Sequence, residues 1–229
     1  MIFGKVFALL VCLVFPVCVL VYCLVKKRGR AAFILGILVF FLSQVVLRIP
    51  LLNLAQSTFL YNLISLRYPI LFVLLLGFSA ALFENVVRYL LMRFFMKKQQ
   101  NWEAGLFFGL GHGGLEAVLL VGISVAAQLF SPTTLSMEWM YGLGGFERVI
   151  AIVLQAGLSV IVWKSVVARK PLYLLLAIGI HGLIDTITGL WPQYIQVAGS
   201  PLIFEGILAV IGLSVFLYAF RLKKDWSVG

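Results

Sequence analysis

Long apolar runs joined by short polar connections are the feature that most constrains this chain. Such runs fall at 3–25, 31–47, 68–95, 104–130, 148–168, 171–190 and 202–220. A helix needs roughly 20 residues to cross a hydrocarbon core about 30 Å thick, so each run is close to or above the required length. Hydrophobic residues make up 63% of the 229 residues and charged residues 11%, which leaves too little polar sequence to cover a soluble domain. The sequence therefore predicts an all-α fold, a polytopic transmembrane helix bundle of about seven spans in a single integral membrane domain over residues 1–229.

The net charge of +10 comes from basic residues that are clustered after alternate apolar runs. Of the 18 Lys and Arg residues, 13 fall in four clusters, at 26–30, 93–98, 164–170 and 221–224. These clusters follow the first, third, fifth and seventh runs, and cytoplasmic loops carry such clusters in membrane proteins. We therefore expect the N-terminus outside and the C-terminus in the cytoplasm, in an integral protein of a bacterial cell membrane. The basic residues predict the lipid bilayer as a partner and no nucleic acid.

The segment 50–66, "PLLNLAQSTFLYNLISL", carries no charge and is long enough for an eighth span. If it crossed the membrane, however, the basic cluster at 93–98 would move outside. The basic clusters would then no longer all lie on the same side of the membrane. Polar residues such as Asn53, Gln56 and Asn62 also dilute its apolar character. We expect an interfacial or re-entrant helix on the outer side.

Three pairs of polar residues interrupt the apolar runs far from their ends. They are Glu84 with Arg88, His112 with Glu116, and His181 with Asp185. In each pair the spacing of four residues puts both side chains on one face of a helix. The pairs use both histidines of the protein. Because ionisable groups inside a membrane are costly, each pair needs a partner or a task.

The three pairs lie at matching depths. His112 is ten residues after Trp102 and His181 is ten residues after Pro171, which puts both about 15 Å from the cytoplasmic side at 1.5 Å per residue. Glu116 and Asp185 lie one turn deeper, at about 20 Å, and counting back from Lys97 gives about 20 Å for Glu84 also. Three spans therefore bring polar side chains to one level, which predicts a single cluster. Taken alone, each histidine could serve only as a helix–helix hydrogen-bonding residue, and Glu84 with Arg88 only as a neutralising pair.

Five glycines surround His112, at positions 105, 109, 111, 113 and 114. Small residues let membrane helices pack closely, which is one interpretation. The other is a surface that an extended substrate backbone approaches.

Two carboxylates and two imidazoles in a cavity of low dielectric can activate water for hydrolysis. The same groups could hold a divalent metal through His112, His181 and a carboxylate, although neither spacing is the HExxH zinc signature.

The alternative is a proton- or cation-coupled transporter, which also uses chains of Glu, His and Asp. No inverted repeat is visible, however, and the polar residues gather at one level rather than toward both faces. A third alternative is a membrane scaffold without activity.

The order and spacing of these motifs resemble those of YhfC-type membrane peptidases, which are related to the PrsW and the CAAX-processing and bacteriocin-immunity proteases. The resemblance rests on Glu84 to Arg88, on Phe108-x-x-x-His112-x-x-x-Glu116 within "GLGHGGLEA", and on His181-x-x-x-Asp185. The motif-bearing core covers about 68–190. The resemblance implies an intramembrane endopeptidase whose substrate is a membrane protein or a lipid-anchored peptide.

The resemblance also implies roles for these residues. Glu84 would activate water with His112 as its partner, and His181 with Asp185 would support the oxyanion or bind a metal. Arg88 and Glu116 would orient these groups. The family pattern usually begins with two adjacent acids, whereas this chain has Asn85 after Glu84, and an amide can still hydrogen-bond a water. A zinc ion held by His112, His181 and Glu84 and a glutamate-dependent reaction without metal both remain open at this point.

Overall fold

The computed structural model describes residues 2–98, 100–197 and 199–226. Within them, seven helical segments are long and apolar enough to cross a membrane, which confirms the predicted all-α bundle. The first comprises α1 (Phe3–Leu9), η1 (Leu10–Val14) and α2 (Phe15–Lys26), and the second comprises α3 (Arg30–Phe40), η2 (Phe41–Arg48) and α4 (Ile49–Gln56). The short helix α5 (Phe59–Arg67) precedes the third, α6 (Pro69–Phe95). The fourth comprises α7 (Trp102–Ala117), η3 (Val118–Gly122) and α8 (Ile123–Ala127). The last three are α9 (Leu135–Ala168), α10 (Leu172–Tyr194) and α11 (Ser200–Arg221), which leads into η4 (Leu222–Trp226).

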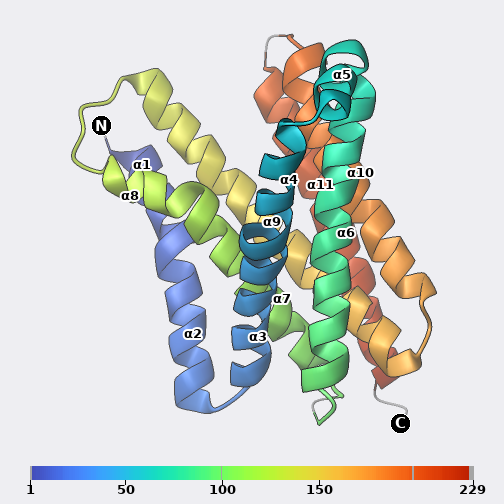
Figure 1. Cartoon of the computed structure of the whole chain (residues 1–229). Coiled ribbons are helices and arrows are strands. Elements are labelled where there is room, and N and C mark those ends of the chain that lie inside the picture. Colours follow the sequence, from blue (N-terminus) through green and yellow to red (C-terminus); the bar gives the residue numbers. More distant parts are fainter. Residues whose placement is uncertain (1, 99, 198, 227–229) are drawn as a thin grey trace.

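The connections that carry the basic clusters share one end of the bundle. Figure 1 shows the α2–α3, α6–α7 and α9–α10 connections at its lower end, together with the C-terminal segment. The N-terminal helix α1, the α8–α9 connection and α5 lie at the opposite end (Figure 1). This arrangement agrees with alternate crossings by the seven segments.

The segment 50–66 forms two helices, rather than the one helix expected from the sequence. Its first part continues the second span as α4, and its second part is α5. The break falls at Ser57 and Thr58, whose hydroxyls donate to the carbonyls of Leu54 and Ala55 at 2.8 and 2.7 Å. The Thr58 hydroxyl then accepts from the backbone N–H of Tyr61 at 3.3 Å and begins α5. Hydroxyl side chains compete with the helical hydrogen bonds in this way, which is why the helix stops there.

Helix α9 begins 13 residues earlier than the run at 148–168 predicted. Thr134 caps it by accepting from the N–H of Met137 at 3.3 Å. The acidic residue in its first turn, Glu138, is buried and accepts from the N–H of Gly4 at 2.9 Å. Helix α9 runs unbroken for 34 residues and is the most buried of the seven spans in the described residues. Arg148, the first residue of the predicted run at 148–168, therefore lies within the helix.

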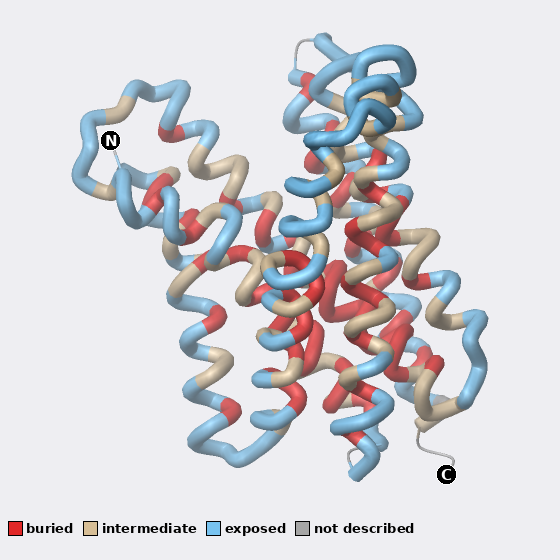
Figure 2. The backbone as a smooth tube through the Cα atoms, in the orientation of Figure 1, coloured by how far each residue is buried: buried red, intermediate tan, exposed pale blue. Residues whose placement is uncertain are grey.

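Helix α7 packs between α3 and α9, and glycines allow the close approach. A Cβ at Gly36 would overlap the carbonyl of Phe108, and one at Gly111 would overlap the carbonyl of Phe33. A Cβ at Gly109 would in turn meet the backbone of Ala156 on α9. The glycines around His112 therefore serve helix packing, and the five of them contact other helices. Figure 2 shows buried residues concentrated where α7, α9 and α6 pass one another.

Candidate active site

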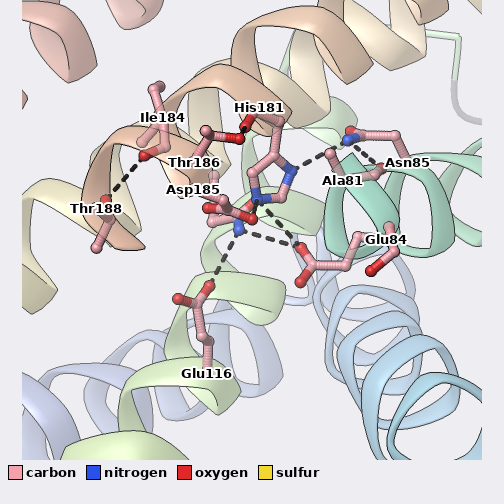
Figure 3. A network of polar contacts seen from close by, with 12 residues as sticks. Ala81, Glu84, Asn85, Glu116, His181, Ile184, Asp185, Thr186 and Thr188 are labelled. Atoms are coloured by element: carbon pink, nitrogen blue, oxygen red, sulfur yellow. Dashed lines mark hydrogen bonds and ion pairs between the residues drawn. The ribbon is translucent and has the colours of Figure 1, made fainter. Parts of the chain in front are cut away.

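The polar residues predicted to form one cluster do lie together, near the middle of the bundle. Glu84, Asn85 and Arg88 come from α6, His112 and Glu116 from α7, and His181 and Asp185 from α10. Figure 3 shows His181 of α10 between Glu84 and Asn85 of α6, with Glu116 on the other side of the network. Arg88 and His112 are fully buried, and Glu84 and His181 are almost so.

Both oxygens of the Glu84 carboxylate accept hydrogen bonds from side chains of other helices. Gln44 of η2 donates its Nε2 to Oε1 at 2.6 Å. His112 Nε2 lies 2.9 Å from Oε2, and Gln155 of α9 donates its Nε2 to Oε2 at 3.3 Å. Glu84 is therefore the point at which four spans meet. Oε1 accepts one of these bonds, so a lone pair remains there for a further donor.

Each of the two glutamines is oriented by an arginine. Arg88 Nη2 donates to Gln155 Oε1 at 2.6 Å, and Arg48 Nη1 donates to Gln44 Oε1 at 3.1 Å. Since a guanidinium can only donate, it fixes the carbonyl end of each amide toward itself and the NH₂ end toward Glu84. Two parallel Arg–Gln relays thus hold one carboxylate, one at each oxygen. The segment η2 that carries Gln44 and Arg48 is π-helical, a rare geometry that is frequent at functional sites.

Asn85 fixes the tautomer of His181. Arg88 Nη1 donates to Asn85 Oδ1 at 3.1 Å, so the amide nitrogen faces the other way. That nitrogen donates to the carbonyl of Ala81 at 2.8 Å and lies 3.1 Å from His181 Nδ1. Nδ1 must therefore accept, and the imidazole hydrogen is on Nε2.

The Nε2–H of His181 has no close acceptor among the described residues. It lies 3.7 Å from Glu84 Oε2 and 3.6 Å from Asp185 Oδ2, both beyond hydrogen-bonding distance. This N–H group is therefore available to donate a hydrogen bond to a bound substrate. His112 differs, because its Nε2–H is already directed at the Glu84 carboxylate, and its buried Nδ1 lacks a partner in the described part of the chain.

Glu116 joins the network through residues that sequence reasoning missed. It accepts from Gln155 Nε2 at 3.0 Å and from Arg148 Nη1 at 2.9 Å, and Arg148 pairs with Glu147 as well. Gln155, like Gln44, is uncharged, so a search for ionisable residues passes over it. The available signal was a glutamine in the middle of an apolar run.

Asp185 is the member of the cluster that connects it to open space. Its side chain is 32% exposed, compared with 6% for Glu84. A cavity of about 500 Å³ between α5, α6 and α10, called the α6–α10 cavity below, reaches Asp185 from the end of the bundle that carries α5. A smaller cavity of about 90 Å³ lies on the other side of α10, and Glu116, Gln155, His181 and Asp185 line part of it.

Comparison with known proteins places the chain in a family. It matches the family model described as YhfC intramembrane metalloprotease over residues 10–132 and 125–211. This chain belongs to the YhfC family. It is 34% identical over 179 residues to the Bacillus subtilis (strain 168) protein named "Uncharacterized membrane protein YhfC", an alignment covering 65% of this chain and 69% of that protein. No solved structure matches.

The description of the YhfC family implies a metal, and the donor set of this chain does not fit one as arranged. No group of three or more His, Cys, Asp and Glu side chains among the described residues is placed to hold a metal ion. The hydrogen bonds give the reason. Zinc binds the lone pair of an imidazole nitrogen, whereas His181 and His112 both carry hydrogen on the Nε2 atoms that face Glu84. To bind zinc through His112, His181 and Glu84, both imidazole rings would have to change their hydrogen bonds, and the Asn85 amide would have to change its own as well.

Proposed function

We propose that this protein is an intramembrane endopeptidase that hydrolyses a peptide bond in a membrane-embedded or membrane-anchored substrate. One observation carries the proposal. A buried carboxylate, Glu84, is held rigidly by two amides and an imidazole, and a free N–H donor, His181 Nε2, lies 3.7 Å away. A base beside an oxyanion donor is what addition of water to a carbonyl requires. Membership of a family described as intramembrane metalloproteases supports the reaction class.

In the proposed reaction Glu84 removes a proton from a water molecule. The hydroxide adds to the carbonyl carbon of the scissile peptide bond, and the carbonyl oxygen accepts from His181 Nε2–H. Glu84 then passes its proton to the leaving nitrogen as the C–N bond breaks, which restores the carboxylate. Rigid positioning matters here, because a catalytic group held in place avoids reorganisation during the reaction.

The remaining residues hold these groups in position. His112 and Gln155 fix Oε2 of Glu84, and Asn85 fixes the His181 tautomer. Asp185, 3.6 Å from His181 Nε2, limits the rotation of the imidazole at the edge of the cavity. Glu116 is coupled to Glu84 through the shared amide of Gln155.

We further propose that the end of the bundle with the four basic clusters is cytoplasmic, in a bacterial cell membrane, with the N-terminus outside. In that orientation the α6–α10 cavity opens toward the outer half of the bilayer. A membrane-anchored polypeptide would reach Asp185 through this cavity.

Purified protein in liposomes, incubated with a library of single-span reporter peptides, tests the proposal. Glu84→Gln and His112→Ala should each abolish cleavage, whereas Glu103→Gln, an exposed glutamate paired with Arg28, should cleave normally. A chelator should leave wild-type cleavage unchanged. Cleavage that persists in Glu84→Gln would contradict the proposal. Proton flux through wild-type liposomes, lost in Glu84→Gln, without any cleavage would instead support the transporter.

A further inference from the structure

Arg48 differs from the two other arginines inside the bundle in how far it lies from any carboxylate of the described residues. Arg148 is paired with Glu116 and Glu147, and Arg88 lies 4.0 Å from Glu84. Among the described residues, Arg48 has no carboxylate oxygen within 4.0 Å, although it lies in a membrane-spanning segment and is half-buried. An arginine in such a position ordinarily finds a counter-charge.

The guanidinium of Arg48 is nevertheless held rigidly. Its Nε donates to Ser79 Oγ at 3.1 Å, its Nη1 to Gln44 Oε1 at 3.1 Å, and its Nη2 to the carbonyl of Leu76 at 2.8 Å. All three acceptors are neutral. They leave two of the five guanidinium N–H groups to bind another acceptor. Arg48 is thus a fixed positive charge with donors to spare.

Arg48 lines the α6–α10 cavity, which leads to the proposed active site. The other charged residue of its lining is Asp185, which lies near His181 at the inner end. Apolar residues such as Phe72 and Leu76 form much of the wall, and Ser65 and Gln193 stand toward the end that carries α5. The cavity measures about 500 Å³, its walls are largely apolar, and its cation stands apart from the one carboxylate of the lining at the inner end. Beside Arg48 it fits a peptide segment that carries a negative charge.

We propose that Arg48 binds a carboxylate of the peptide substrate within the α6–α10 cavity. This inference rests on the proposed function and adds a substrate class, namely membrane-anchored peptides with an acidic group near the scissile bond. Leu76 and Ser79, which hold Arg48, lie eight and five residues before Glu84 on α6, or roughly 7–12 Å. An extended peptide covers that distance in roughly two to four residues at about 3.3 Å each. The carboxylate therefore belongs two to four residues from the bond that is cut.

The binding of this carboxylate would also act on the catalytic group. Arg48 donates to Gln44, and Gln44 donates to Oε1 of Glu84. A carboxylate on Arg48 therefore reinforces the relay that positions the proposed base. Arg48 is a specificity and positioning residue in this scheme, and Glu84 remains the group that acts on water.

The test compares matched peptides rather than absolute activity. A single-span peptide of leucine and alanine carries one glutamate, moved residue by residue along the span, and a second series carries glutamine instead. Wild-type protein in phosphatidylcholine vesicles should cleave the glutamate series at least about tenfold faster, at a bond two to four residues from the glutamate, because a charge-assisted hydrogen bond is at stake. Arg48→Gln should abolish this ratio and Arg48→Lys should keep part of it. Arg67→Gln, at the exposed end of α5, should leave it unchanged. Retention of the full ratio by Arg48→Gln would overturn the inference.

Two further experiments show which anionic group binds Arg48: a side-chain carboxylate, a terminal carboxylate or a lipid phosphate. Glutamine peptides with a free or an amidated C-terminus show whether a terminal carboxylate serves as well as a side chain. Vesicles with added phosphatidylglycerol show whether a lipid phosphate occupies Arg48. Loss of the wild-type ratio in those vesicles would overturn the inference in favour of a lipid site.

A binding measurement on Glu84→Gln distinguishes failure of this inference from failure of the proposed function. The glutamate peptide should bind this variant at least about tenfold more tightly than the glutamine peptide, and the double variant with Arg48→Gln should lose the difference. Such binding without cleavage by wild-type protein would reject the peptidase and keep the carboxylate site. Cleavage of both series at equal rates would reject the carboxylate site alone.

Discussion

Nη2 of Arg88 lies 2.6 Å from Oε1 of Gln155, whereas it lies 4.0 Å from the carboxylate of Glu84, its neighbour one turn away. The arginine therefore acts on Glu84 mainly through an amide. Gln155 donates the same Nε2 to Glu84 and to Glu116, so one amide joins two carboxylates to one cation. Two of the predictions below test this relay.

Replacement of Gln155 by leucine should remove activity and weaken the fold. The change leaves Arg88, the buried Glu84 and the partly buried Glu116 without their shared partner, and an unsatisfied buried group costs about 1–3 kcal/mol. We expect cleavage to fall at least about 100-fold, in line with the loss of a group that positions a catalytic residue. Thermal unfolding in detergent and cleavage rates of Gln155→Leu measure the two effects. Gln155→Glu has a similar shape, but an ionised carboxylate cannot donate, so this variant should be equally inactive. A fully active Gln155→Glu would contradict the relay.

Replacement of Arg88 by lysine should separate charge from geometry. Lysine keeps the positive charge, but it lacks the planar fork that reaches Asn85 and Gln155 together. We expect Arg88→Lys to remain folded and to lose cleavage at least about tenfold, with kcat rather than KM affected. Arg93→Lys, on the same helix and exposed, is the matched control and should be active. Normal kcat in Arg88→Lys would show that charge alone suffices.

Replacement of Asn85 by aspartate should reverse the His181 tautomer. A carboxylate accepts where the amide donated, so Nδ1 would carry the hydrogen and Nε2 would expose a lone pair. We expect Asn85→Asp to bind Zn²⁺ at least about tenfold more tightly than wild type, because a ligating histidine is normally held by such an acceptor. Nitrogen chemical shifts of His181 report the tautomer, and titration calorimetry reports zinc affinity. Equal zinc affinity in both proteins would refute the tautomer assignment.

Gly36→Ala should destabilise the bundle, while Gly179→Ala should not. A Cβ at Gly36 overlaps the backbone carbonyl of Phe108, which cannot move without separating α3 from α7. Overpacking of this kind costs about 1–3 kcal/mol. No described atom lies within 4 Å of a Cβ at Gly179, and alanine suits a helix better by about 1 kcal/mol. Thermal unfolding of the two variants gives the comparison, and equal midpoints would exclude a packing role for Gly36.

Gly36→Ala should also lower activity, since α3 leads into η2 and hence to Gln44. Displacing α3 moves the amide that donates to Oε1 of Glu84. Cleavage by the folded fraction, measured well below the unfolding midpoint, tests this link. Unchanged activity there would show that η2 holds its position independently of α3.

The sequence was most informative about residues whose burial in a membrane costs much free energy. Charged and imidazole side chains inside apolar runs stand out, and helical spacing alone placed Glu84, His112 and His181 at depths within about one helical turn of one another. It was least informative for Gln44 and Gln155, because a neutral amide in a span costs less and marks no site. Arg148 was predicted at the start of a span because Glu147 and Arg148 interrupt the apolar sequence there, whereas the helix begins at Leu135.

The sequence by itself determined the membrane bundle, its seven spans and the level at which the polar pairs lie, because these follow from hydropathy and the helical rise along one chain. Only the tertiary structure decided which way each amide points, which histidine nitrogen carries hydrogen, and which arginine has no carboxylate oxygen of the described residues within 4.0 Å. Those properties depend on donors and acceptors supplied by other helices. Arg88 orients Gln155 on α9, and Gln155 in turn holds Glu84 on α6. Such directions are settled when the helices pack, since a hydrogen bond requires both partners in place.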